Sequence, residues 1–202
     1  MGQIIDIKSD SSLSNFPERP LSMHPKKFAL WLFICTVIMI FGALTSAFIV
    51  RKADGNWLEF ELPVLLWVNT IIILFSSATL QWSYFSAKRD NINNLKIGIA
   101  ITFFLGILFV IGQFYAWKEL VSMGVYFGGS SSNPSGSFIY VLTGLHALHL
   151  VSGIIFLLFV LVASFQYKVH SKNMVRIEMC ATYWHFLDFL WIYLFGFLIL
   201  NN

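Results

Sequence analysis

Five long apolar stretches dominate the sequence and set its fold class. Each is 20 to 27 residues long, and together they make up more than half of the 202 residues. About 20 apolar residues carry an α-helix across the hydrocarbon of a bilayer, whereas a transmembrane strand needs about half as many and alternates in polarity. The sequence therefore predicts an all-α, polytopic membrane protein, a bundle of five transmembrane helices. The expected spans are residues 28–50, 63–86, 97–117, 138–164 and 181–200.

The composition excludes a soluble domain and several kinds of site. Hydrophobic residues make up 57% of the chain and charged residues 11%, whereas soluble domains are about a quarter charged. The net charge of +3 gives no support to a nucleic-acid partner. The two cysteines, Cys35 and Cys180, are too few for a disulfide scaffold or a cysteine-rich zinc or iron–sulfur site.

The loops predict the topology. Residues 1–27 are polar and mixed, so we expect a cytoplasmic tail followed by a transmembrane domain over residues 28–202. With the N-terminus inside, ten of the 13 Lys and Arg residues lie in inside segments and three in outside segments. Inside loops of membrane proteins carry an excess of Lys and Arg. The sequence therefore predicts an inside N-terminus and an outside C-terminus.

A few ionisable groups lie in or next to the expected spans. His146 and His149 lie in the fourth span, His185 and Asp188 in the fifth, and Glu178 just before the fifth. Such groups cost about 2.5–3.5 kcal/mol each at the centre of a bilayer, so each needs a partner. A spacing of three predicts that the two members of each pair share one helix face. Glu178 precedes His185 by seven residues, which predicts a polar stripe along the fifth helix.

Three interpretations of these groups compete. Two histidines and a carboxylate suit zinc, iron or copper, but a His-x-x-His spacing is common. A proton or ion relay of a transporter is the second interpretation, although only one acid lies within a span. The third, which we favour, is hydrogen bonding between helices and towards lipid head groups. At about 1.5 Å per residue, Asp188 lies roughly 10 Å and His149 roughly 22 Å from the inner ends of their spans. Direct pairing of Asp188 with His149 is therefore not expected.

Two segments carry a resemblance to a known family. Residues Tyr183–Phe195 read YWHFLDFLWIYLF, and residues Leu142–Gly153 read LTGLHALHLVSG. Both resemble signature segments of subunit III of the haem–copper cytochrome c and quinol oxidases, and Glu178 matches a glutamate that precedes the family's histidine by seven. The resemblance covers residues 28–200 and keeps the order and spacing of the motifs.

The chain departs from the family pattern in two respects. Longer members have seven spans, so five spans resemble the short bacterial form that lacks the first two. Many members also carry a carboxylate midway along the first span of this set, where this chain has Val37. The role of that carboxylate is therefore not carried over.

The resemblance implies a non-catalytic accessory subunit of a proton-pumping terminal oxidase that reduces oxygen in aerobic respiration, in the bacterial inner membrane. Haem and copper are then expected in partner subunits I and II, and bound phospholipid in this chain, with no catalytic or metal-binding residues here. A quinol-oxidising complex, bound in a supercomplex, is a further expected partner. Nucleic acid is not an expected partner. His146 and His149 are predicted to brace the fourth helix, and Glu178, His185 and Asp188 to form the polar stripe. The remaining candidates are Trp184, as a lipid or helix neighbour, and Lys172 and Arg176, as contacts of lipid phosphate.

Two alternatives stay open at this stage. The related accessory subunit of nitric oxide reductase would share the same motifs. A stand-alone transporter or a haem-binding membrane protein would also suit a small helical bundle with buried histidines.

Overall fold

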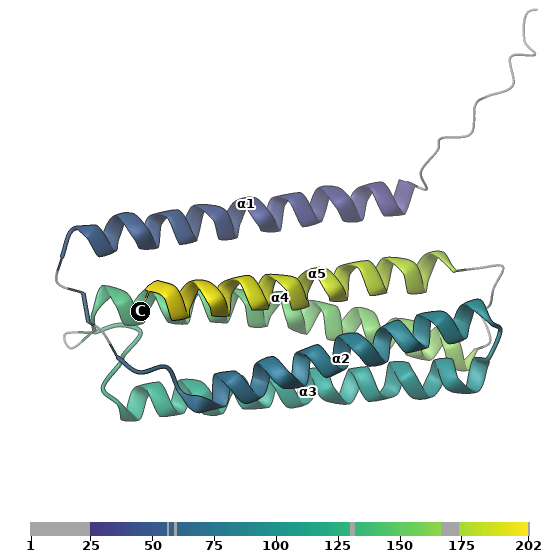
Figure 1. Ribbon diagram of the computed structural model, residues 1–202. Coiled ribbons are helices and arrows are strands. Elements are labelled where there is room, and N and C mark those ends of the chain that lie inside the picture. Colours follow the sequence, from purple (N-terminus) through teal and green to yellow (C-terminus); the bar gives the residue numbers. More distant parts are fainter. Residues whose placement is uncertain (1–24, 56, 59, 130–131, 167–173, 202) are drawn as a thin grey trace, which may run out of the picture.

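The computed structural model describes residues 25–55, 57–58, 60–129, 132–166 and 174–201, and these residues form five α-helices (Figure 1). Each helix is long and apolar enough to cross a membrane, which confirms the predicted all-α, five-span architecture. In chain order the helices are α1 (Pro25–Ala53), α2 (Val64–Lys88), α3 (Ile92–Ser122), α4 (Pro134–Phe165) and α5 (Val175–Asn201).

The helices extend beyond the apolar runs that predict them. α1 begins at Pro25, so Lys27, which we expected in the tail, lies in its first turn. α5 begins at Val175, so Glu178 lies inside the helix rather than before it. Hydropathy reflects the thickness of the hydrocarbon, whereas a helix continues until its terminal backbone groups are capped. At the start of α4, for example, the side chain of Asn133 accepts a hydrogen bond of 3.0 Å from the backbone N–H of Ser135.

Helices α2 to α5 form a four-helix bundle, and α1 lies along one side of it (Figure 1). Within the bundle α2 packs on α3 and α5, and α4 packs on α3 and α5, whereas α1 packs on α4 and α5. The starts of α1, α3 and α5 and the ends of α2 and α4 lie together at one end of the molecule. We call this the proximal end. Which side of the membrane it faces remains a prediction.

Two groups of buried side chains hold the helices together. The larger lies mainly inside the four-helix bundle, where it contains Phe109, Trp184 and Trp191, and it also includes Ile34 of α1. The smaller joins α1 to α4 and α5 and includes Phe41 and Phe48. Large apolar side chains on the outside of all five helices are exposed, which suits a surface that faces lipid tails or partner helices.

Candidate functional site

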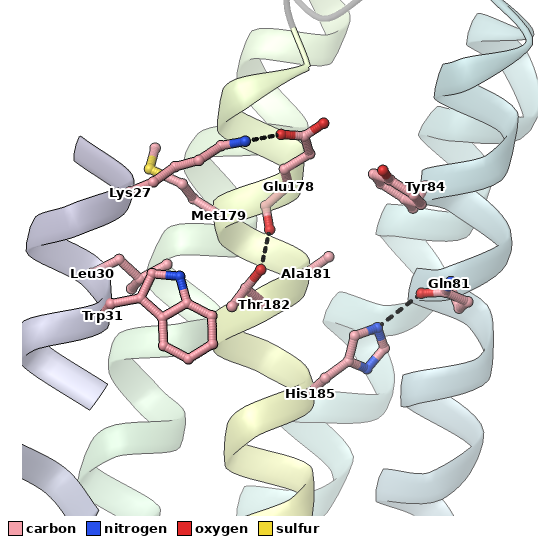
Figure 2. A pocket seen from close by; sticks show the side chains of 10 residues that line it. All are labelled: Lys27, Leu30, Trp31, Gln81, Tyr84, Glu178, Met179, Ala181, Thr182 and His185. Carbon is pink, nitrogen blue, oxygen red and sulfur yellow. Dashed lines mark hydrogen bonds and ion pairs between the residues drawn. The ribbon is translucent and has the colours of Figure 1, made fainter. Parts of the chain in front are cut away.

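A pocket at the proximal end gathers polar side chains from three helices (Figure 2). It has a cavity volume of about 480 Å³ and lies between the start of α1, the end of α2 and the first turns of α5. Its walls combine one basic, one acidic and several hydrogen-bonding side chains with apolar ones. The lining residues are Lys27, Leu30, Trp31, Gln81, Tyr84, Glu178, Met179, Ala181, Thr182 and His185.

An ion pair between α1 and α5 lies at the outer part of this pocket. The Lys27 Nζ pairs with the Glu178 carboxylate, and both side chains are about one-third exposed, 36% and 31%. The Thr182 hydroxyl donates a hydrogen bond of 2.8 Å to the backbone carbonyl of Glu178 (Figure 2). A partly exposed pair of this kind contributes at most about 1 kcal/mol to stability, because solvent screens it. Both charged groups are therefore partly accessible to solvent.

His185 lies at the other end of the pocket and joins α5 to α2. Its Nε2 lies 3.1 Å from the Gln81 Oε1, and its Nδ1 lies 2.7 Å from the Ser77 hydroxyl. The amide oxygen can only accept, so Nε2 carries the proton and donates. In the neutral imidazole Nδ1 then accepts a hydrogen bond from Ser77. Both ring nitrogens are therefore satisfied by α2.

Asp188 lies one turn further along α5, away from solvent. The residue is 3% exposed, and its Oδ2 lies 4.0 Å from the Nδ1 of His185. Within the described part of the chain, neither carboxylate oxygen has a hydrogen bond of ordinary length and angle. Ser77 lies beside both side chains. The structure thus brings His185 and Asp188 together, as their spacing predicts, and adds a hydroxyl from α2.

Trp184 is a helix neighbour, because its side chain is buried in the bundle. Only 1% of the residue is exposed, and its Nε1 donates a hydrogen bond of 3.0 Å to the Ser76 hydroxyl on α2. Gly106 on α3 and Gly153 on α4 face the indole ring. A glycine at each point lets the helix backbones approach the ring closely.

The two histidines of α4 point to different neighbours. His146 is fully buried inside the bundle, where its ring centroid lies 6.0 Å from that of Phe109 and 5.1 Å from that of Trp191. His149 is directed towards α1, with its ring centroid 5.9 Å from that of Phe41. The spacing of three thus places them on neighbouring sides of the helix, and the imidazoles do not converge on one site. The described hydrogen bonds and ion pairs join neither of them to Asp188.

A hydroxyl pair links α4 to α5 near His149. The Ser152 and Tyr183 hydroxyls lie 2.7 Å apart, and the Tyr183 hydroxyl also lies 3.3 Å from the backbone carbonyl of His149. This link uses the backbone of His149 rather than its ring. The predicted bracing by the two imidazoles therefore remains a prediction.

The two basic candidates for lipid phosphate fall in different parts of the chain. Arg176 lines a second cavity of about 600 Å³ between α1, α4 and α5, together with Lys26 and Gln166. Lys172 lies outside the described residues. Among the residues that the structure describes, no group of three or more His, Cys, Asp or Glu side chains is arranged to hold a metal ion.

Residues of the pocket outside α5 were not recognised from the sequence as site residues. In the sequence, Lys27 is an ordinary charged residue of the polar tail. Gln81 and Tyr84 are ordinary residues of the second span. The spacing of Ser77 and Gln81 by four predicts a shared face on α2 and was a usable signal. Nothing in the sequence indicated that this face meets His185.

Comparisons with known proteins agree with the motifs of the fourth and fifth spans. The profile of the family described as cytochrome c oxidase subunit III matches residues 56–200. A probable cytochrome c oxidase subunit 3 of Mycobacterium bovis is 34% identical over 164 residues, which cover 78% of this chain and 79% of the relative. A probable cytochrome c oxidase subunit 3 of Nocardia farcinica is 32% identical over 177 residues, or 83% of this chain and 82% of the relative.

A subunit of a ubiquinol oxidase is also similar to this chain. Subunit 3 of a cytochrome bo(3) ubiquinol oxidase from Buchnera aphidicola is 27% identical over 175 residues, covering 84% of this chain and 88% of the relative. The region matched by the family profile contains α2, α3 and α4 in full and α5 except for its last residue, together with both motifs. The chain belongs to the cytochrome c oxidase subunit III family, the accessory membrane subunit of the haem–copper terminal oxidases.

Proposed function

We propose that this chain stabilises the subunit I core of a proton-pumping terminal oxidase in a bacterial inner membrane, with haem and copper held by subunits I and II. The family and the names of the relatives support the oxidase subunit, and the five apolar helices support a multi-pass membrane position. The large apolar surface of the bundle supports contact with partner helices. Contact of this apolar surface with a quinol-oxidising complex in a supercomplex belongs to the same proposal.

We infer that the same chain binds a phospholipid in the proximal pocket, and the observation that carries this is the lining of that pocket. The Lys27–Glu178 pair lies at its outer part, and hydrogen-bonding side chains lie further in. An apolar groove of about 380 Å³ runs between α1 and α5 and shares Trp31 with the pocket. A polar pocket that adjoins an apolar groove suits a head group and an acyl chain of one lipid.

Neutralising the ion pair is expected to lower the amount of phospholipid that stays with the complex. In the double variant Lys27→Gln, Glu178→Gln the pocket keeps its shape and loses both charges. We expect less phosphorus per complex after purification in mild detergent, measured by phosphate assay and by mass spectrometry of the extracted lipid. The control is Lys118→Gln. Lys118 is exposed and lies near the end of α3 that is far from the proximal pocket. Equal lipid content in both variants would contradict the assignment of the pocket.

Replacing Asp188 with alanine is expected to shorten the working life of the oxidase and to leave its haem content unchanged. The change removes a buried side chain beside His185 and Ser77 and leaves a cavity where α5 packs on α2, which weakens this contact. The measurement is the time course of oxygen consumption together with the visible spectrum of the purified complex. Loss of haem absorbance per assembled complex would show that the accessory role is wrong.

Purification from the native membrane tests the assignment as a whole. A tagged copy of this chain, solubilised in mild detergent, is expected to bring down a large haem–copper subunit. The chain dissociated from that complex is expected to show no haem band. A haem band in the separated chain would replace the proposed function with that of a haem-binding membrane protein. A partnerless chain that moves protons or solutes in vesicles would replace it with that of a stand-alone transporter.

A further inference from the structure

Three neutral polar side chains are buried inside the four-helix bundle, apart from the proximal pocket. Asn69 on α2, Gln113 on α3 and His146 on α4 are 1%, 1% and 0% exposed. Taking the described residues together, none of the six nitrogen and oxygen atoms of these side chains has a hydrogen-bond partner. Polar groups surrounded by hydrocarbon are strongly disfavoured unless they are hydrogen bonded.

The contacts on the α2–α3 side place the Asn69 amide against Gly112, the residue before Gln113. Gly112 directly precedes Gln113 in α3, and a Cβ added at Gly112 would overlap the amide group of Asn69. Asn69 therefore reaches across the seam between the two helices to the backbone of α3. Gly112 and Gln113 are consecutive and about 1.5 Å apart along the helix axis, so Asn69 and Gln113 belong to the same layer of the bundle.

Ring contacts bring His146 to the same layer from the α4 side. The His146 ring lies against Phe109, which is one helical turn from Gln113 on the buried face of α3. It also lies against Trp191, whose centroid is 5.1 Å away. The Nε1 of Trp191 donates a hydrogen bond of 3.0 Å to Thr70, the neighbour of Asn69 in α2. One indole ring thus reaches from His146 to the Asn69 region.

The chemistry of this layer selects a small neutral ligand. Two amides and a neutral imidazole offer both donors and acceptors. The rings of Phe109 and Trp191 lie against His146, and an ion would find no opposite charge among the three side chains. Buried water typically makes about three hydrogen bonds to polar groups that otherwise lack partners.

We propose that Asn69, Gln113 and His146 bind ordered water in the interior of the bundle, and that this water joins α2, α3 and α4. The site does not depend on the proximal pocket or on the oxidase assignment, because all three side chains belong to the core of this chain. In this arrangement His146 contributes to helix association through water, and not through a direct contact with another polar side chain.

The first test is a cryo-EM structure of the purified native assembly at a resolution that shows ordered water. The expected result is at least one density within hydrogen-bond distance of two or more of the three side chains. Direct hydrogen bonds among the three side chains, with no density between them, would overturn the proposal. Density with the coordination geometry of a metal ion would overturn it as well.

A set of variants supplies the second test. Gln113→Met keeps the length of the side chain and removes its polar atoms, so the water loses a partner. We expect this single variant and Asn69→Leu each to lower the thermal denaturation midpoint of the detergent-solubilised assembly and to weaken the density. The triple variant with His146→Phe is expected to be less destabilised than the sum of the single effects, because no polar group remains to be satisfied.

A control change on the surface completes the experiment. Thr36→Val removes an exposed hydroxyl of α1 that bonds only within its own helix among the described contacts. It is expected to leave the midpoint unchanged. Strictly additive effects of the three core variants, with the native density unchanged in Gln113→Met, would show that the three groups do not share bound water.

Discussion

Trp184→Ala is expected to lower the free energy of unfolding by about 3–5 kcal/mol, the range for removing a fully buried large side chain. The indole fills the space between Gly106 on α3 and Gly153 on α4, and its Nε1 donates to Ser76 on α2. The substitution therefore removes packing from three neighbouring helices and leaves a buried hydroxyl without its donor. The measurement is the thermal denaturation midpoint of the chain in its purified assembly, together with the yield of that assembly.

Two further tryptophan variants separate packing from hydrogen bonding. Trp184→Phe keeps most of the ring and loses the Nε1 donor, so a smaller loss of about 1 kcal/mol is expected. Trp82→Ala changes a tryptophan of α2 that is 44% exposed, and it is expected to have little effect on the midpoint. If Trp184→Ala were as stable as Trp82→Ala, the interior position of Trp184 would be wrong.

Gly98→Ala is expected to destabilise the protein by about 1–3 kcal/mol through overpacking of the α2–α3 seam. A Cβ at this position would lie 2.7 Å from the Cβ and 3.2 Å from the Cα of Ser83, and 3.2 Å from the carbonyl oxygen of Thr79. Two of these atoms belong to the backbone of α2, so relief requires the two helices to separate. Separation would also weaken the hydrogen bond of 2.8 Å that the Ser83 hydroxyl donates to the carbonyl of Leu95.

Gly196→Ala is the matched control for this variant. Gly196 is also inside a helix, but nothing lies within 4 Å of a Cβ added there. Alanine favours a helix over glycine by up to about 1 kcal/mol, so this change is expected to be neutral or stabilising. Denaturation midpoints of the two variants, measured in the same detergent, are compared directly. Similar midpoints would contradict the close approach of α2 and α3 at Gly98.

The number and class of the helices could be predicted because hydrocarbon imposes a strict length on an apolar helix. The ends could not be predicted as well, because helices continue past the hydrocarbon until they are capped. Lys27 and Glu178 show the consequence. The sequence predicted a tail residue and a residue before the span, and the structure places both in the first turns of helices that face each other.

The family was also predicted from the sequence, and the comparisons confirmed it. The motif of the fifth span identified His185 and Asp188 as residues of interest. It did not predict that Ser77 and Gln81 hold the two ring nitrogens of His185, or that Trp184 and Trp191 donate to hydroxyls of α2. These partners lie in a helix that is about a hundred residues away in the chain.

The amino-acid sequence by itself determined the membrane class, the five spans, the few polar groups within them and the family. Only the tertiary structure decided which groups meet. The His146 ring lies inside the bundle against Trp191 and the His149 ring lies against Phe41 of α1, although the two residues are only three positions apart. The reason is physical. The helical repeat sets the angle between two side chains on one helix, whereas the neighbour that each side chain reaches depends on how the helices pack around that axis.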